Sequence, residues 1–394
     1  MSIARVIAEA MQKSSWIRKM FEEGAKLKEE HGVDKVHDFS LGNPEIEPPE
    51  NFLKTFEECA AERTPGLHRY MQNSGYPWVR EKIAAAKSEE SGIDIPWQNI
   101  IMNVGAGGAL NVFFKAVCDP GDEIIIIAPF FVEYLFYISN HGGVPKVCES
   151  NPDFSLNLEN IEAAINEKTK AIILNTPNNP TGVLYPESQL KEVGELLARK
   201  EKELGKDIYL ISDEPYKRIL FDGEKHAQFL RVYENAIVVH SHSKDLGLPG
   251  ERIGTLTISP NCTHAADLIG ATTFAIRTLG FVNAPALHQR AVADHQATTI
   301  DPMIYQKKRD MICAIFDDAG IEYIRPKGAF YIFPKSPIED DVQFVRSLQK
   351  HFILAVPGTG FGRGGHIRMA YCVSDAHIEG ARDGFMAATK EARG

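Results

Sequence analysis

The sequence lacks several patterns that mark large classes of proteins. Its cysteines are scattered singly, at Cys59, Cys118, Cys148, Cys262, Cys313 and Cys372. No Cys-x-x-Cys pair is therefore present for zinc binding or redox chemistry, and we expect no metal site. No run approaches the roughly 18 apolar residues of a membrane span. Residues 1–16 carry charges and no central apolar block of signal-peptide length. We expect a cytoplasmic protein with reduced thiols.

An excess of positive charge is also missing. The 394 residues carry a net charge of −10, which argues against a nucleic-acid surface, because such a surface needs a basic stripe. Internal repeats and low-complexity tracts are absent as well. A chain of this length is too long for one ordinary core, so we expect two domains.

What the chain does contain is an alternation of helical stretches with short apolar runs. The runs are 100–104, 123–127, 171–174, 208–211 and 237–239. This order is typical of a mostly parallel sheet with helices on both faces. The last hundred residues instead combine a helical stretch at 304–316 with short strands at 321–324, 328–333, 355–356 and 367–371, which favours a smaller α+β domain. We expect an N-terminal segment (1–45) that packs with a small domain (291–394), and a large domain (46–290) between them.

The stretch from Ser241 to Gly254 carries the clearest chemistry. Lys244 follows the apolar run 236–240, so it is expected at the carboxyl end of a strand, where ligands bind in open α/β sheets. A lysine there can form an imine with an aldehyde, and Arg252 supplies a permanent charge suited to a phosphate. Together they suggest pyridoxal phosphate. Ser241-x-x-Lys244 also fits one element of penicillin-binding enzymes, but their Ser-Asp-Asn and Lys-Thr-Gly elements are missing. Lys244 alone could also be a solvated loop lysine.

Other strand ends offer further candidate ligands. Residues 105–108 join the strand ending at Val104 to a helix expected to open at Ala109, and form either an anion site or a plain tight turn. Phe131 is either a stacking aromatic or ordinary core. Asn179, in the turn 175–182, donates either to a ring oxygen or to its own backbone.

An aspartate and a glycine pattern complete the survey. Asp213 ends a buried run, where a carboxylate needs a cationic partner such as a protonated pyridine nitrogen; the alternative is an N-cap for a following helix. Residues 360–365 match Gly-x-Gly-x-x-Gly, but a strand is expected after them rather than the helix that a dinucleotide site requires.

With these residues assembled, the chain resembles the fold-type I pyridoxal phosphate enzymes, specifically the class I/II aminotransferases similar to aspartate aminotransferase. The matching positions span nearly the whole chain, in the family's order: Gly42-Asn43-Pro44, Tyr70, Gly105-Ala106-Gly107, Phe131, Asn179-Pro180-Thr181-Gly182, Asp213 with Tyr216, Ser241-x-Ser243-Lys244, Arg252 and Arg368. The resemblance implies a large domain with a seven-stranded, mostly parallel sheet, a smaller α+β domain and a homodimer.

The resemblance also implies a role for each matching position. Lys244 would hold the cofactor as an imine and then move a proton as general base and acid, while Asp213 would pair with the pyridine nitrogen. Residues around the ring would be Tyr216 and Asn179 at the phenolic oxygen and Phe131 as the stacking aromatic. Residues at the phosphate would be Ala106, Gly107, Ser241, Arg252 and, from a second subunit, Tyr70.

Substrate contacts follow in the same way. Arg368 would bind the α-carboxylate, with Asn179 and the backbone of Gly42 beside it. Without the other motifs, Arg368 would be interpreted as an arginine on the solvent face of a strand. One branch of the family has a lysine for a distal carboxylate where this chain has Gly107. Another branch uses an arginine of the partner subunit that lies a little before an Asn-x-Pro turn. Arg277, ahead of Asn283-Ala284-Pro285, is the candidate if its spacing from this turn may differ by one residue. The alternative is a solvated arginine on a helix.

The expected reaction is a ping-pong transfer of an amino group from aspartate to 2-oxoglutarate. Alternatives are an aminotransferase for aromatic or neutral amino acids and a cysteine-S-conjugate β-lyase. Regulators that carry an aminotransferase-like domain also have a DNA-binding domain, and no extra basic domain precedes residue 40, so we expect small-molecule substrates and neither nucleic acid nor membrane as partners.

Overall fold

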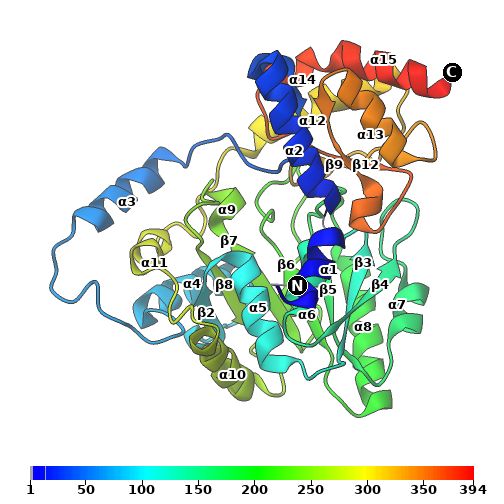
Figure 1. The fold of residues 1–394 in the computed structure, drawn as a ribbon. Helices are drawn as coiled ribbons and strands as arrows, with labels where there is room; N and C mark the ends of the chain where they lie inside the picture. Colours follow the sequence, from blue (N-terminus) through cyan, green and yellow to red (C-terminus); the bar gives the residue numbers. More distant parts are fainter. Residues whose placement is uncertain (1–2, 14) are drawn as a thin grey trace.

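The computed structural model describes residues 3–13 and 15–394 (Figure 1), and its centre is a seven-stranded sheet. The spatial order is β2-β8-β7-β6-β5-β3-β4, and within the described chain β8 alone runs antiparallel to its neighbours. The strands are β2 (Ile100–Asn103), β3 (Glu123–Ala128), β4 (Val144–Glu149), β5 (Thr169–Asn175), β6 (Tyr209–Asp213), β7 (Ala236–Ser241) and β8 (Gly254–Ile258). The expected seven-stranded, mostly parallel sheet is confirmed.

Helices cover both faces of this sheet (Figure 1). One apolar core joins the sheet to α4 (Pro77–Ser91), α7 (Leu158–Ala164), α8 (Glu187–Leu204) and α11 (Ala286–Val292). A second core, on the other face, joins it to α5 (Gly105–Val117), α6 (Glu133–Ser139) and α10 (Ala265–Thr278). Strands buried on both faces must be apolar throughout, which is why β3 reads Glu-Ile-Ile-Ile-Ile-Ala.

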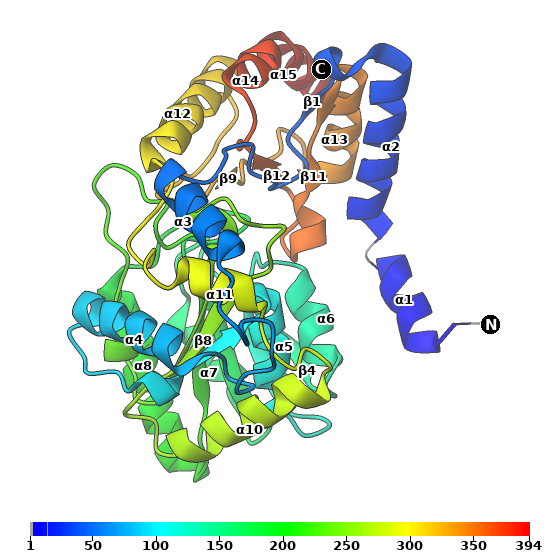
Figure 2. The same ribbon diagram turned by 90° about the vertical axis from the view of Figure 1, so that its left-hand side faces the viewer.

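A second group of elements lies above the carboxyl ends of the parallel strands (Figures 1 and 2). It contains an antiparallel sheet in the order β11-β12-β9 and a parallel pair, β1 with β10. These strands are β1 (His37–Asp38), β9 (Tyr331–Ile332), β10 (Ile353–Leu354), β11 (Val356–Pro357) and β12 (Ile367–Ala370). Their shared core contains Phe39 from the N-terminal part of the chain together with residues from 300 onward.

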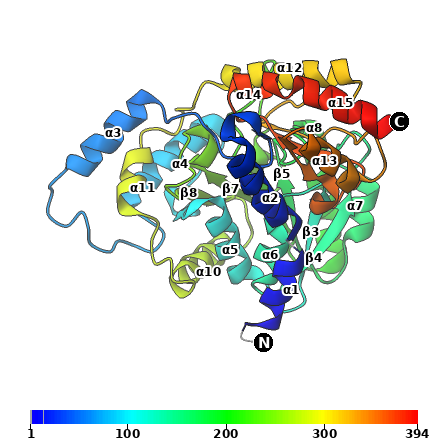
Figure 3. The same cartoon turned by 45° about the horizontal axis from the view of Figure 1, so that its top comes forward.

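The remaining helices belong mostly to this second group. In Figure 3, α12, α14 and α15 form a layer along its top, and Figure 2 shows α1 extending away from the body of the molecule. The helices are α1 (Arg5–Lys13), α2 (Ser15–His31), α3 (Glu50–Ala61), α9 (His242–Asp245), α12 (Pro302–Ala319), α13 (Asp341–Lys350), α14 (Asp375–Gly380) and α15 (Arg382–Arg393). Short 3-10 helices span Val33–Lys35, Trp97–Asn99, Phe229–Arg231 and Gly358–Phe361. None of the described helices is both long and apolar enough to cross a membrane.

Three local expectations were wrong. The helix after β2 begins at Gly105 rather than Ala109, so the glycine-rich turn is its first turn. Residues 321–324 form no strand, because their one backbone bond to a neighbouring segment, Lys335 N to Glu322 O at 2.8 Å, does not start a ladder. The predicted strands also did not include β4, which is an edge strand, or β8, which contains two threonines.

Candidate active site

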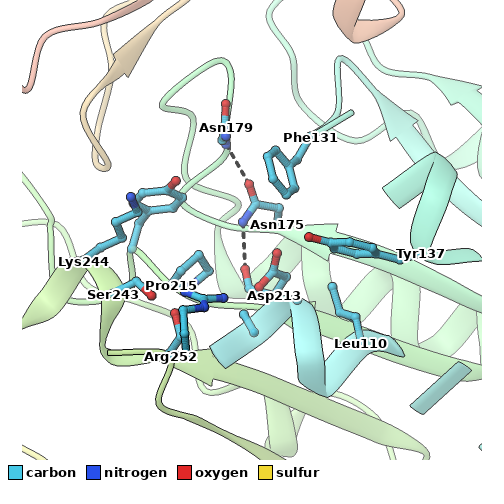
Figure 4. A pocket seen from close by; sticks show the side chains of 14 residues that line it. Leu110, Phe131, Tyr137, Asn175, Asn179, Asp213, Pro215, Ser243, Lys244 and Arg252 are labelled. Carbon is cyan, nitrogen blue, oxygen red and sulfur yellow. Dashed lines mark hydrogen bonds between the residues drawn. The ribbon is translucent and has the colours of Figure 1, made fainter. Parts of the chain in front are cut away.

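A pocket lies where β5, β6 and β7 end and α5 begins (Figure 4). Its volume is about 140 Å³. Nine of the residues singled out from the sequence line it: Ala106, Gly107, Phe131, Asn179, Asp213, Tyr216, Ser241, Lys244 and Arg252. These residues span nearly 150 positions of sequence, so the sheet topology is what brings them together.

Lys244 enters the pocket from α9, the single turn of helix that follows β7. Its Nζ donates a hydrogen bond to the carbonyl oxygen of Gly42 at 2.8 Å and lies 5.3 Å from the ring centroid of Phe330. Burial lowers the pKa of Lys244 to about 8; the Cys372 thiol opposes this shift and the charge of Arg252 adds to it. Lys244 is therefore not a solvated loop lysine, and near neutral pH a larger fraction of its amine is neutral and nucleophilic than in an ordinary lysine.

Asp213 is the last residue of β6 and points into the pocket (Figure 4). Tyr134 donates its hydroxyl proton to Oδ2 at 2.5 Å, and Asn175 donates to the backbone oxygen at 2.9 Å. Oδ1 is buried and has no hydrogen-bond partner in the part of the chain that the structure describes. Burial raises the pKa of Asp213 to about 7. Residues 215–218 form a turn, so the N-cap alternative is wrong.

Asn179 lies across the pocket from Asp213, with Asn175 between them (Figure 4). The backbone N–H of Asn179 donates to Asn175 Oδ1 at 2.7 Å. The side-chain oxygen of Asn179 is buried and finds no partner among the described residues. The local turn bond is made instead by Asn178, whose Oδ1 accepts from the N–H of Thr181 at 3.1 Å. The side chain of Asn179 is thus left for a ligand.

The first turn of α5 forms the floor at the other end of the pocket. A Cβ atom on Gly107 would lie 2.8 Å from Tyr137 Oη, and one on Gly105 would lie 2.7 Å from Arg252 Nη2. Gly105 also has φ of +77°, which disfavours any side chain. Backbone amides at a helix N-terminus, with a guanidinium beside them, form a site for a phosphate-sized anion. Ser241, 2 % exposed, ends β7 at the same pocket.

Arg368 reaches this region from β12 of the second group and is only 6 % exposed. Its Nη2 donates to the backbone oxygen of Ser40, and Cζ lies 4.7 Å from the Phe361 ring centroid and 5.3 Å from that of Tyr331. Its Nε is buried without a partner among residues 3–13 and 15–394. Arg368 is therefore not on a solvent face. Gly42 lies close by, since a Cβ there would overlap the Tyr331 hydroxyl.

Four predicted site residues do not line the pocket. Gly42 and Arg368 lie beside it, as described above, and Tyr70 and Arg277 are exposed elsewhere on this single chain. Tyr70 is 88 % exposed in the segment between α3 and α4. Arg277 is exposed on α10, with its guanidinium 5.0 Å from the ring centroid of Phe274.

Sequence reasoning also missed several contributors to the site. Tyr134 and Asn175 hold Asp213, Tyr137 lines the wall beside Gly107, and Tyr331 receives a hydrogen bond from Tyr216 Oη at 3.3 Å. Asn175 could have been found, because it directly follows a predicted strand. The tyrosines carry no signal in the sequence, since most tyrosines are half-buried structural residues.

One pocket thus contains the three groups that pyridoxal phosphate requires. They are a lysine of lowered pKa, a buried carboxylate oxygen without a partner among the described residues, and an anion site. The family model described as aminotransferase class I and II matches residues 34–385. The chain belongs to this family, and it is a pyridoxal phosphate-dependent aminotransferase.

Individual relatives agree with this assignment. The chain is 32 % identical over 360 residues to an aspartate/prephenate aminotransferase of Thermus thermophilus, covering 90 % of this chain and 91 % of the relative. It is 28 % identical to aromatic-amino-acid aminotransferase 2 of Thermococcus litoralis, covering 97 % of both. The crystal structure of an aminotransferase from Eubacterium rectale matches with a TM-score of 0.96 and 33 % identity, over 100 % of both chains.

Proposed function

We propose that this aminotransferase moves the amino group of L-aspartate to 2-oxoglutarate. The observation that carries the choice of an amino acid substrate is Arg368, a buried guanidinium whose Nε has no partner among the described residues. It lies over the ring of Tyr331, which also borders Gly42, and Gly42 in turn accepts the hydrogen bond of the Lys244 amine. A fork of this kind suits a carboxylate. Aspartate as the donor is supported by the name of the Thermus thermophilus relative.

The residues of the pocket divide between the two ends of the cofactor. Asp213 Oδ1 would accept from the protonated pyridine nitrogen, while Asn179 and Tyr216 would bond the phenolic oxygen and Phe131 would stack on the ring. The phosphate would be held by Ala106, Gly107, Ser241 and Arg252. When bound, pyridoxal phosphate withdraws electrons from Cα of an attached amino acid.

The chain's own residues then supply orientation and proton transfer. Arg368 holds the α-carboxylate, with Asn179 and Gly42 beside it, and so fixes the direction of the Cα–H bond. Lys244 takes the Cα proton and returns it as general acid; a pKa of about 8 suits both tasks near neutral pH. Asp213 is held by Tyr134, so its free oxygen stays directed into the pocket.

We further propose a homodimer in which Tyr70 reaches the phosphate of the partner subunit. The support is its exposure of 88 %, unusual for a tyrosine with a binding role within one chain. A cytoplasmic location is supported by the six cysteines, all within the described residues, none of which forms a disulfide. Residues 1–45, 46–290 and 291–394 are the proposed N-terminal segment, large domain and small domain.

The cofactor-loaded protein tests the function directly. Aspartate, glutamate, alanine, tyrosine and cystathionine are added one at a time, and the absorbance change to the pyridoxamine form is followed. Lys244→Ala should lower turnover by more than about 100-fold, because it removes the proton-transfer group, and borohydride should fix cofactor to Lys244 in the wild type only.

Each outcome of that experiment has a stated meaning. Conversion by the two acidic amino acids supports the proposed donor. Wild-type turnover in Lys244→Ala, with Lys244→Arg as the charge-preserving control, contradicts the assignment. Pyruvate from cystathionine without pyridoxamine formation indicates a β-lyase. Conversion by tyrosine or alanine instead favours the second candidate, an aromatic or neutral amino acid aminotransferase.

A specific observation favours that second candidate: residue 107 is glycine, and Tyr137 occupies the space beside it, so this chain places no lysine there for a distal carboxylate.

Arg277 of the partner subunit is then the remaining candidate for binding a distal carboxylate. Arg277→Ala should lower kcat/KM for aspartate and glutamate by about tenfold or more and leave that for alanine unchanged. Lys202→Ala, an exposed cation on α8, is the control; an equal loss toward alanine would argue against a role for Arg277.

A further inference from the structure

Three buried titratable side chains surround the turn that carries Lys244 and have no part in the proposed mechanism. They are His240, His242 and Asp245, exposed by 3 %, 1 % and 1 %. We refer to them as the His–Asp cluster. None of the three lines the cofactor pocket, so they contact neither cofactor nor substrate directly.

The cluster is connected by hydrogen bonds that converge on one carboxylate. Asp245 Oδ2 lies 3.0 Å from Nε2 of His240 and 3.3 Å from Nδ1 of His242. The other oxygen, Oδ1, accepts from the backbone N–H of Leu246 at 2.8 Å. The remaining nitrogen of His240, Nδ1, lies 3.0 Å from the backbone oxygen of Glu214.

These contacts determine how many protons the cluster holds. Both ring nitrogens of His240 face acceptors, a backbone carbonyl on one side and a carboxylate on the other. Burial lowers the pKa of His240 to about 4 although Asp245 opposes this shift, so near neutral pH the ring is neutral and carries one N–H. The Asp245 carboxylate is tolerated in the interior because it accepts a hydrogen bond from the N–H of Leu246 and has both imidazole rings within hydrogen-bond distance.

The pair of His240 and Asp245 also bridges the two strand ends that carry the proposed chemistry. Glu214 directly follows Asp213 at the end of β6, and Asp245 directly follows Lys244 in α9, the single turn of helix after β7. The ring of His240 thus spans from the backbone beside Asp213 to the side chain beside Lys244. A third segment joins the same turn, because the N–H of Ile300 donates to the backbone oxygen of Asp245 at 2.7 Å.

We propose that the His–Asp cluster is a positioning network that fixes Lys244 relative to Asp213. This inference rests on the proposed roles of those two residues. Without the buried pair, the single turn of α9 would lose the side-chain link to β6, and the Lys244 amine would gain water and freedom of position. The network acts through Lys244 and Asp213 and takes no part in proton transfer to the substrate.

Other titratable groups lie near the cluster. The charge of Lys217 disfavours a proton on His240. His295 lies near His242, and burial lowers the pKa of His295, so it adds no positive charge near neutral pH. Burial alone would raise the pKa of Asp245, but His242 and His240 hold it far below its usual range. The carboxylate is therefore the partner that keeps the cluster together.

A metal ion is the competing explanation, since the three ligand atoms all lie within 4.8 Å of one another. Both oxygens of Asp245 already have hydrogen-bond partners, and both nitrogens of His240 lie within hydrogen-bond distance of an acceptor, whereas Nε2 of His242 is buried with no partner among the described residues. Elemental analysis separates the two ideas. One equivalent of a transition metal that survives dialysis would overturn the positioning network, because the ion would replace the hydrogen bonds between the two imidazole rings and Asp245.

The test uses Asp245→Asn, which keeps the shape of the side chain and removes its charge. In cofactor-free protein, acetylation of Lys244 by acetic anhydride is followed by mass spectrometry across a pH series. The midpoint should rise from about 8 in the wild type toward that of an ordinary lysine. In the loaded enzyme, kcat should fall by about tenfold or more, with KM for the amino donor nearly unchanged because Arg368 is untouched.

Glu201→Gln is the matched control. Glu201 Oε1 accepts from the N–H of Ile208 and from Asn235, and so links the opposite, amino ends of β6 and β7. It should lower the melting temperature without moving the Lys244 midpoint or kcat. If Asp245→Asn behaves in the same way, the cluster is only structural and the inference fails.

Two further results keep the conclusions separate. His240→Gln retains a donor toward Asp245 and should give a smaller change in the same direction, which provides a second test if Asp245→Asn does not fold; an unchanged midpoint and kcat would contradict the proposal. If the wild type itself binds no pyridoxal phosphate at Lys244, the proposed function fails, whatever the variants show.

Discussion

At the scale of single residues, the site depends on groups whose ordinary protonation is disturbed by burial. Asp213 is buried, and Tyr134, the one donor to its side chain within the described residues, does not offset the cost of burying a carboxylate. Its pKa of about 7 means that, before the cofactor binds, the folded protein holds a proton on Asp213 that the unfolded chain releases at much lower pH.

The sign of the resulting pH dependence follows from this shift. Because the folded-state pKa lies above the unfolded one, the folded state binds more protons between about pH 4 and pH 7, and stability decreases as pH rises through that window. Asp213→Asn should remove the decrease, making the cofactor-free variant more stable than the wild type above pH 7 by up to about 4 kcal/mol. Urea unfolding at several pH values measures it, and parallel curves for the two proteins would contradict the buried, raised pKa.

At the scale of secondary-structure elements, the first turn of α5 leaves no room for a side chain at Gly107. Gly107→Ala places a methyl group 2.8 Å from Tyr137 Oη, a contact that must be relieved by a shift of the first turn or of the tyrosine. We expect pyridoxal phosphate affinity to fall by about tenfold, measured by cofactor titration.

A second substitution identifies the cause. Adding Tyr137→Phe to Gly107→Ala removes the oxygen that the methyl group meets and should restore most of the affinity, while Tyr137→Phe alone serves as the control. If the double variant binds as weakly as Gly107→Ala, the loss does not arise from this contact.

The same scale shows which parts of the fold the sequence could predict. The buried strands β3, β5, β6 and β7 are continuous apolar runs, and the turns after three of them carry the polar residues that meet in the pocket. β4 escaped notice because it is an edge strand whose Val144 and Val147 are nearly half exposed. β8 escaped notice because its Thr255 and Thr257 read as polar, although both are buried. The His–Asp cluster could not be foreseen either, since one of its partners is the backbone of Glu214.

At the scale of the whole molecule, the proposed dimer predicts a complementation between two inactive proteins. Lys244→Ala removes the proton-transfer group, and Tyr70→Ala removes the proposed contact with the partner subunit's phosphate. A mixed dimer would then contain one doubly defective site and one intact site. Co-expression of the two variants with different tags, followed by isolation of the mixed dimer, should restore about half of wild-type activity. Activity no higher than that of Tyr70→Ala alone would show that Tyr70 acts within its own chain.

The pairing of β1 with β10 bears on how the molecule is made. Strand β1 pairs with β10, and Phe39 belongs to a core that otherwise draws on residues 216–221 and on residues from 300 onward, whereas the seven strands of the large sheet lie between residues 100 and 258. On the ribosome, the large sheet can therefore assemble while α2 and β1 have no partners to pack against. Both elements are synthesised before the sheet but can pack only after it, so during translation they stay exposed to proteases and chaperones.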